Sequence, residues 1–367
     1  MEQEFQSALS VTAGIEQPPE VSPAALQRFL ARQRKKPLSV SDYVEGILHG
    51  NRTLLSQAIT LVESALPEHE VQAQEIVSRC LPYAGRSVRI GITGVPGVGK
   101  STFIESMGMH LVTKEHRKLA VLAIDPSSER SKGSILGDKT RMEQLSVHPD
   151  AFIRPSPSAG SLGGVARKTR ESIILCEAAG FDTVFVETVG VGQSETSVHA
   201  MTDFFLLLMI SGAGDELQGI KRGIMEMADL IAINKADGDK VHAADVTRVQ
   251  YQNALHLFPL AASGWHPTAL CCSSVMHTGM AEIWKAIQQY LELTRGNGFF
   301  SERRKRQSAY WMYTFIEEQL KHRFYQHATV KEQLAWYEQR VADNQLSPFA
   351  AADRLIEDYL RQQTERS

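Results

Sequence analysis

The sequence has little cysteine, no long apolar run and no excess of charge of one sign. Its four cysteines in 367 residues (Cys80, Cys176, Cys271 and Cys272) are too few for a disulfide framework, which fits a reducing compartment. The longest aliphatic run, Phe204–Ile210, is far shorter than the roughly 20 residues that span a bilayer. Lysine and arginine total 39 against 42 aspartates and glutamates, so no positive field favours nucleic acid.

The N-terminus is acidic and polar and lacks the basic and apolar segments of an export signal. We therefore expect a cytoplasmic protein with no nucleic-acid partner and no membrane insertion. A hydrophobic content of 43% is ordinary for a globular protein, and the length allows two or three structural units.

Hydrophobic periodicity predicts three regions. Residues 1–85 are expected to be helical, because apolar residues such as Val44 and Ile47 recur at helical spacing and Pro67 begins a further helix. Residues 86–296 alternate apolar runs with helical stretches, which predicts a doubly wound α/β domain with a mostly parallel sheet. Residues 297–367 show no strand pattern and predict a helical extension that serves as a dimerisation arm.

The predicted elements of the central region are short and regularly spaced. Strands are expected over residues 88–92, 119–124, 183–186, 204–210, 230–233 and 269–272. Helices are expected over residues 101–113, 165–179 and 281–292.

The C-terminal region carries apolar stripes that need cover, either on its own domain or on a second copy. We predict a symmetric dimer built on the helices around residues 311–324 and 334–341. The short basic run Arg303-Arg304-Lys305-Arg306 favours a solvated helix start over an anionic partner.

The most informative segment matches the pattern of a phosphate-binding loop. It reads Gly94-Val95-Pro96-Gly97-Val98-Gly99-Lys100-Ser101-Thr102 and lies between a predicted strand and a predicted helix. Its glycines let backbone N–H groups surround phosphate oxygens, and the helix beginning at Lys100 adds its partial positive charge. We expect Lys100 to reach the β- and γ-phosphates and Ser101 to bind Mg²⁺.

A second motif, Asn234-Lys235-Ala236-Asp237, follows the strand expected over 230–233 and predicts recognition of guanine. The Asp237 carboxylate can accept from the N1–H and the amino group of guanine. Adenine lacks that pair of donors, so such a site discriminates on the order of 10⁴-fold. Ser273-Ser274-Val275 follows the next strand, where it either holds the base through backbone N–H groups or forms a plain turn.

Three acidic residues are candidates for the metal and hydrolysis loops. Asp125 and Glu187 each end a predicted strand, and Asp138 lies in a glycine-rich segment. Mg²⁺ prefers such oxygen ligands, directly or through water, although each carboxylate could instead cap nearby backbone. Cys271 and Cys272 lack zinc-site spacing, and we expect them to be buried.

Several motifs together resemble the MeaB/ArgK/MMAA family of P-loop GTPases. The matching segments are residues 94–102, 123–128, 137–142, 154–157, 187–195 and 234–237, and the resemblance covers roughly residues 40 to 340. Glu187 stands where ordinary G proteins have Asp, which is typical of the wider group of metal- and cobalamin-associated GTPases. No glutamine directly follows Gly190, so we expect slow hydrolysis with an unassigned water-positioning group.

The resemblance implies a homodimer that binds GTP or GDP with Mg²⁺ and acts as a chaperone for an adenosylcobalamin-dependent methylmalonyl-CoA mutase. It places Asp125, Asp138 and Glu187 in the metal and switch regions. Residues 212–221, with Gln218 and Lys221, resemble an extra switch that relays the nucleotide state to the mutase. Two alternatives stay open: a kinase of a lysine/arginine/ornithine transport system, and a nucleotide-gated interaction module with negligible turnover.

Overall fold

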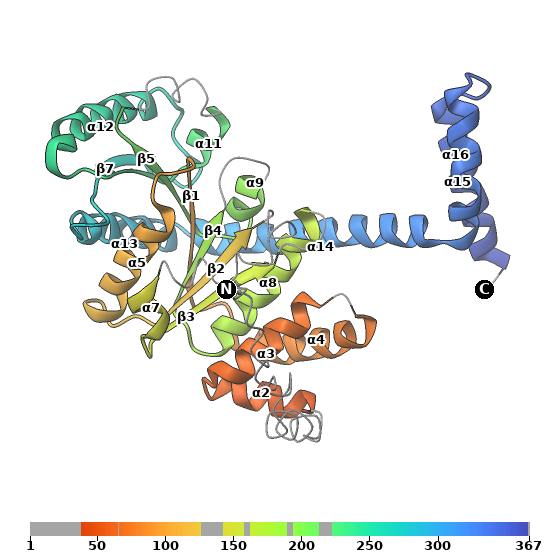
Figure 1. Ribbon diagram of the computed structural model, residues 1–367, viewed down its shortest axis with the longest axis horizontal. Coiled ribbons are helices and arrows are strands. Elements are labelled where there is room, and N and C mark those ends of the chain that lie inside the picture. Colours follow the sequence, from red (N-terminus) through yellow and green to blue (C-terminus); the bar gives the residue numbers. More distant parts are fainter. Residues whose placement is uncertain are drawn as a thin grey trace, which may run out of the picture.

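A computed structural model describes residues 38–64, 66–125, 142–157, 162–188, 194–212 and 222–365. It confirms the predicted fold class. Seven strands form one parallel sheet in the order β3-β2-β4-β1-β5-β6-β7, with helices on both faces (Figure 1). From β1 the chain passes to β2 and β3 on one side, returns to β4 between β1 and β2, and then continues to β5, β6 and β7 on the other side. The carboxyl ends of the central strands form the edge where such folds bind ligands.

All six predicted strands are present, and each end agrees with the prediction to within two residues. They are β1 Val88–Gly94, β2 Leu119–Asp125, β4 Thr183–Thr188, β5 Phe204–Ile210, β6 Leu230–Asn234 and β7 Thr268–Cys271. Most are apolar on both faces and buried, because helices cover the sheet on each side.

The sequence analysis missed the edge strand β3, Ala151–Pro157, because Pro155 and Pro157 resemble strand breakers. The Leu119 N–H donates to the Asp150 carbonyl over 2.9 Å. From Asp150 onward, therefore, the backbone N–H and C=O groups of every second residue point towards β2. Both prolines therefore face outward, where their missing N–H costs no ladder bond. At that position they also protect the edge against pairing with another strand.

One face of the sheet is covered by α5 Lys100–Thr113, α7 Glu143–Val147 and α13 Met280–Gly296, whose apolar residues form a continuous core with β1. On the other face lie the N-terminal helices, with α8 and α9 beside them, and further along α11 and α12. The bounds are α2 Val40–Leu48, α3 Arg52–Glu63, α4 Pro67–Cys80, α8 Leu162–Ala178, α9 Ser194–His199, α11 Arg222–Met227 and α12 Val241–Leu255.

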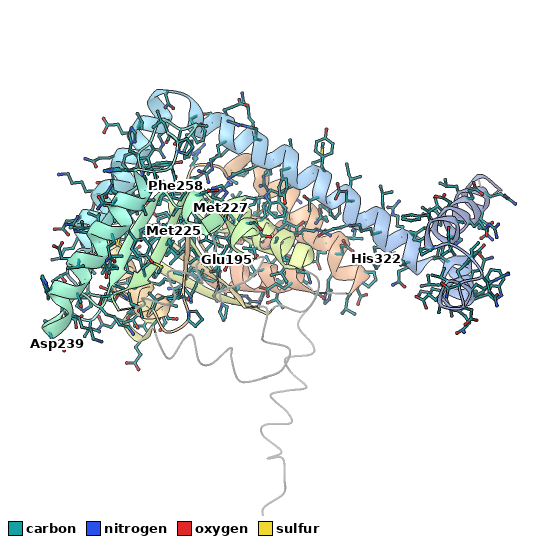
Figure 2. The ribbon with its side chains drawn as sticks, turned by 90° about the horizontal axis from the view of Figure 1, so that it is seen from above. Glu195, Met225, Met227, Asp239, Phe258 and His322 are labelled. Carbon is teal, nitrogen blue, oxygen red and sulfur yellow. The ribbon has the colours of Figure 1, made fainter. Side chains whose placement is uncertain are left out.

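The C-terminal helices extend away from the sheet. Helix α14, Phe299–Gln326, starts on the domain and carries α15 Ala328–Ala342 and α16 Pro348–Glu365 at its far end (Figure 1). His322, near the end of α14, lies well away from the sheet (Figure 2). Helices α15 and α16 share a small core of their own, formed by Tyr337, Ala351 and Leu355. We refer to α14–α16 as the arm; the division into the three regions 1–85, 86–296 and 297–367 stays a prediction.

The expectation of a solvated basic run was wrong for two of its four residues. Arg304 donates to Asp203 through Nε (2.8 Å) and Nη2 (2.6 Å), and Arg303 donates to Tyr290 Oη over 3.0 Å. The side chain of Arg303 is only 13% exposed and that of Arg304 only 15%. Lys305 and Arg306, the next two residues of the helix, are exposed to solvent. The sequence could not distinguish the two buried arginines from the two exposed residues, because all four are basic. Only the packing of the helix against the domain decides which side of this turn is buried.

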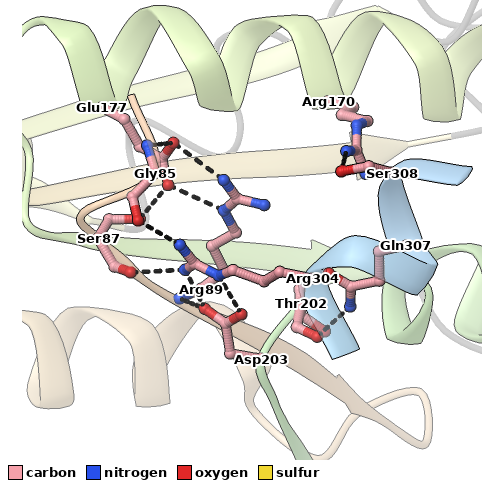
Figure 3. A network of polar contacts seen from close by, with 10 residues as sticks. All are labelled: Gly85, Ser87, Arg89, Arg170, Glu177, Thr202, Asp203, Arg304, Gln307 and Ser308. Carbon is pink, nitrogen blue, oxygen red and sulfur yellow. Dashed lines mark hydrogen bonds and ion pairs between the residues drawn. The ribbon is translucent and has the colours of Figure 1, made fainter. Parts of the chain in front are cut away.

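Arg304 belongs to a buried polar network that fixes the start of the arm (Figure 3). Arg89 in β1 pairs with Glu177 in α8 through two N–H···O contacts of 2.8 and 2.9 Å. Gln307 Nε2 donates to the Thr202 carbonyl over 2.8 Å. The network thereby joins α14, α8 and the amino ends of β1 and β5 on the side opposite the phosphate loop.

Among the described residues, no helix has both the length and the apolar character that crossing a membrane requires.

Candidate functional site

The predicted phosphate loop has the expected setting. Strand β1 ends at Gly94, residues 95–99 form the loop, and α5 begins at Lys100. A Cβ on Gly94 would lie 2.5 Å from the Leu208 carbonyl oxygen, so no other residue fits there. Gly99 is the N-cap with φ 90°, a left-handed conformation that glycine adopts without strain. The backbone thus turns tightly into the amino end of α5.

Lys100 lies over this loop. Its Nζ donates to the Gly94 carbonyl over 2.9 Å. Burial lowers the pKa of the Lys100 ammonium, while the carboxylates of Glu187 and Glu195 oppose that shift. A cation held in this way at a helix N-terminus is suited to binding phosphate oxygens. Ser101 and Thr102 follow in the first turn of α5, with Ser101 half-buried.

Asn234 connects the phosphate loop to the second motif. Its side-chain Nδ2 donates to the Val98 carbonyl over 2.9 Å. Its Oδ1 accepts from the backbone N–H of Ser274 (3.2 Å) and from the hydroxyl of Ser274 (2.8 Å). Lys235, which has a left-handed φ of 60°, donates from Nζ to the Gly97 carbonyl over 2.8 Å. The structure therefore brings together three segments, since these contacts span 136, 138 and 40 positions of the chain.

Asp237 is half-buried beside the loop that follows β7. The Ser273 hydroxyl donates to its carboxylate, and Ser273 Oγ accepts from the Met276 N–H over 3.1 Å. Ser273 also pairs with Thr278 in an antiparallel bridge that closes the loop. Val275 is 70% exposed at its tip. The serine pair is thus more than a plain turn, since each serine contacts a residue of the guanine motif.

Two contacts around this loop were not expected from the sequence. The buried thiol of Cys272 donates to Asn234 Oδ1 over 3.7 Å, and burial raises the pKa of that thiol to about 12. His277 Nδ1 lies 2.8 Å from the Ser106 hydroxyl in α5. Both residues look incidental in the sequence, because their partners come from distant segments.

Glu187 is buried in β4, directly beside the strand that carries the phosphate loop. It is aligned with Ile92 in β1 and with Ala123 in β2. The next residue, Thr188, donates its hydroxyl to Thr93 Oγ1 over 2.8 Å. Asp125 ends β2 at the same edge, but its side chain lies outside the described part of the structure. The predicted site residues Asp138, Gln218 and Lys221 lie entirely outside the described residues.

A family model described as Methylmalonyl Co-A mutase-associated GTPase MeaB matches residues 55–329. The chain belongs to the MeaB family. A Caulobacter vibrioides protein of this group, named as a GTPase, is 51% identical over 319 residues, which are 87% of this chain and 97% of its own. GTPase ArgK of Escherichia coli is 44% identical over 319 residues, 87% of this chain and 96% of its own.

A mitochondrial MeaB relative from Mus musculus, named Methylmalonic aciduria type A homolog, is 43% identical over 324 residues, 86% of this chain and 78% of its own. A crystal structure titled LAO/AO transport system kinase is 38% identical, with a TM-score of 0.71 over 88% of this chain and 97% of the other. Because the family model and the Caulobacter vibrioides and Escherichia coli relatives are named as GTPases, the protein is a P-loop enzyme of the MeaB family that hydrolyses GTP.

Proposed function

We propose that this MeaB-family GTPase is a nucleotide-dependent chaperone of an adenosylcobalamin-dependent methylmalonyl-CoA mutase. The observation that carries the proposal is the family match over residues 55–329, whose description names that mutase. The phosphate loop and the guanine motif lie within the matched range and contact each other through Asn234. The name of the mouse relative is consistent with the same role.

In this proposal Lys100 and the backbone N–H groups of residues 97–101 bind the phosphates, and Asp237 selects guanine. The donor set fits Mg²⁺, since Ser101 and Glu187 offer the hard oxygen ligands that this ion prefers, and both lie at the carboxyl edge of the sheet. Mg²⁺, when bound, neutralises charge that develops on the phosphates. Asp125 and Asp138 stay candidates for binding the same Mg²⁺ ion, directly or through water.

Hydrolysis follows from positioning and charge neutralisation. Lys100 stabilises the charge on the phosphate oxygens while water attacks in line. Because no glutamine directly follows Gly190, we propose slow turnover in the isolated protein and faster turnover when the mutase is bound.

The test is to incubate the purified protein with γ-labelled GTP, with and without a cobalamin mutase. Release of free phosphate that rises when the mutase is added supports the proposal. Stable label on a transport protein would instead support a kinase, and intact GTP despite tight binding would support an interaction module without turnover.

The relay to the mutase can be tested separately. We propose that Gln218 and Lys221 belong to a switch that carries the nucleotide state to the partner. Gln218→Ala and Lys221→Ala should then abolish stimulation by the mutase and spare basal hydrolysis. Equal loss of both activities would contradict this assignment.

We further propose that the arm forms a homodimer. Trp311 and Phe324 are covered within the chain, but other apolar residues of the arm are exposed, including Tyr313 (61%), Leu320 (61%) and Trp336 (52%). Leu320→Glu should shift the mass in light scattering from dimer to monomer. Val71→Glu, at a 72% exposed position on α4, is the matched control that should leave the mass unchanged.

A further inference from the structure

A cavity of about 540 Å³ lies between α3 and the edge strand β3. Helix α3 buries Leu55, Ile59 and Val62 in the core of the domain, and its other side carries hydroxyl, amide and guanidinium groups. That polar side forms one wall of the cavity, which is open to solvent at Thr53, Gln57 and Thr60, across from Phe152 and Pro155 of β3. The volume is in the usual range of small-molecule sites. The lining is mostly polar, which suits a charged ligand better than an apolar one.

Among the residues that the structure describes, the cavity is lined by two arginines and by no acidic residue. Arg154 already has a carboxylate partner, since it pairs with Glu63 and donates weakly to the hydroxyls of Ser56 (3.4 Å) and Thr60 (3.2 Å). The Glu63 side chain is only 6% exposed behind this guanidinium, so it is shielded from the cavity. An anion that enters would meet cations and hydroxyls instead of a carboxylate.

Arg52 is the arginine whose charge is not compensated. Its Nη1 donates to the His148 carbonyl over 3.1 Å, which uses one of its five N–H groups. Within the described part of the chain, no carboxylate lies within ion-pair distance of Arg52. A guanidinium with spare donors binds a phosphate through two parallel hydrogen bonds.

We propose that this cavity binds the phosphate group of a small phosphorylated molecule. Arg52 pairs with the phosphate, and the hydroxyls of Thr53, Ser56 and Ser146 donate to its oxygens or to the body of the ligand. The cavity is larger than a phosphate ion fills, so a polar body attached to the phosphate is the expected ligand. The site is separate from the phosphate loop, because its residues come from α3, β3 and the end of α7.

The test uses the full-length protein saturated with GDP and Mg²⁺, so that the phosphate loop is occupied. Calorimetric titrations with ribose 5-phosphate, inorganic phosphate and ribose compare the phosphorylated molecule with its two parts. Ribose 5-phosphate should bind and ribose should not. Inorganic phosphate that binds equally well would show that the phosphate group alone carries the affinity, and weaker binding would show that the body contributes.

Arg52→Gln should weaken the binding of ribose 5-phosphate about tenfold or more, because it removes a charge-assisted pair. Thr53→Glu is the second variant, since Thr53 is exposed and a carboxylate is tolerated in the first turn of a helix but repels an anion in the cavity. Arg86→Gln, at an exposed position before β1, is the matched control and should change the affinity less than twofold. Absence of binding to the wild type, or unchanged affinity in both variants, would overturn the proposal.

Discussion

Arg304 of the arm holds Asp203, the residue before β5, through two hydrogen bonds of 2.8 and 2.6 Å. The Asp203 side chain is 1% exposed, and the same carboxylate accepts from the Arg89 N–H over 2.8 Å. One carboxylate therefore joins α14 to the sheet at β1 and β5. The extended arm is fixed to the domain by buried charge in addition to apolar contact with Trp311.

Replacing Arg304 should destabilise the protein strongly. Arg304→Ala leaves the buried Asp203 carboxylate without its main partner, and the loss of one member of a buried pair costs about 3–5 kcal/mol. Urea unfolding followed by circular dichroism measures the change. Arg306→Ala is the control, because Arg306 is 63% exposed and its pair with Glu302 spans 3.9 Å. It should cost less than about 1 kcal/mol; equal effects would mean that the Arg304 pair adds nothing.

Lys100→Ala should lose GTP hydrolysis at least about 10²-fold, because the loop then lacks the cation that stabilises charge on the phosphates. The fold should survive, since within the described part of the chain Lys100 Nζ donates to one carbonyl at the end of β1. Phosphate release under saturating GTP measures turnover. Lys114→Ala, at the exposed end of α5, serves as the control, and turnover near that of wild type in Lys100→Ala would refute the role.

Asp237→Asn should move the preference from guanine to xanthine nucleotides. An amide in place of the carboxylate exchanges an acceptor for a donor, which matches the extra carbonyl of xanthine. Competition between GTP and XTP for the purified protein measures the change. Asp239→Asn is the control, because Asp239 is exposed in the turn Gly238–Lys240 that follows Asp237 (Figure 2). It also removes one negative charge, and the preference for GTP should be kept. Unchanged GTP affinity in Asp237→Asn would count against the assignment.

The protein should lose stability on mild acidification through His199. Burial, with Arg303 beside it, lowers the pKa of His199 to about 4, and Arg303 donates to its Nε2 over 3.1 Å. The unfolded chain therefore binds this proton first, and stability falls as the pH drops from about 6.5 towards 4. Between pH 7 and pH 5 the contribution is about 1–2 kcal/mol, allowing for partial solvent contact.

His199→Gln keeps an acceptor for Arg303 but does not titrate. Urea unfolding at pH 7 and pH 5 should show a smaller loss of stability in His199→Gln than in wild type. If both proteins lost the same free energy of unfolding, another group would be responsible for the pH dependence.

The strand pattern was predictable where burial on both faces gives an apolar run, as in β1 and β5. It failed for β3, because an edge strand tolerates proline on its outward positions and so loses the composition of a central strand. The phosphate loop and the guanine motif were readable because each is contiguous and its chemistry depends on local backbone geometry.

The order of residues along the chain determined the phosphate loop, the guanine motif and the alternation of strand and helix, since each is built from neighbours in sequence. Only the folded chain decided that Ser274 and Cys272 support Asn234, that Arg304 lies against Asp203, and that Arg52 and Arg154 share a cavity. These contacts join segments that are 38 or more positions apart. Their formation depends on how helices and strands pack, which no local pattern of residues specifies.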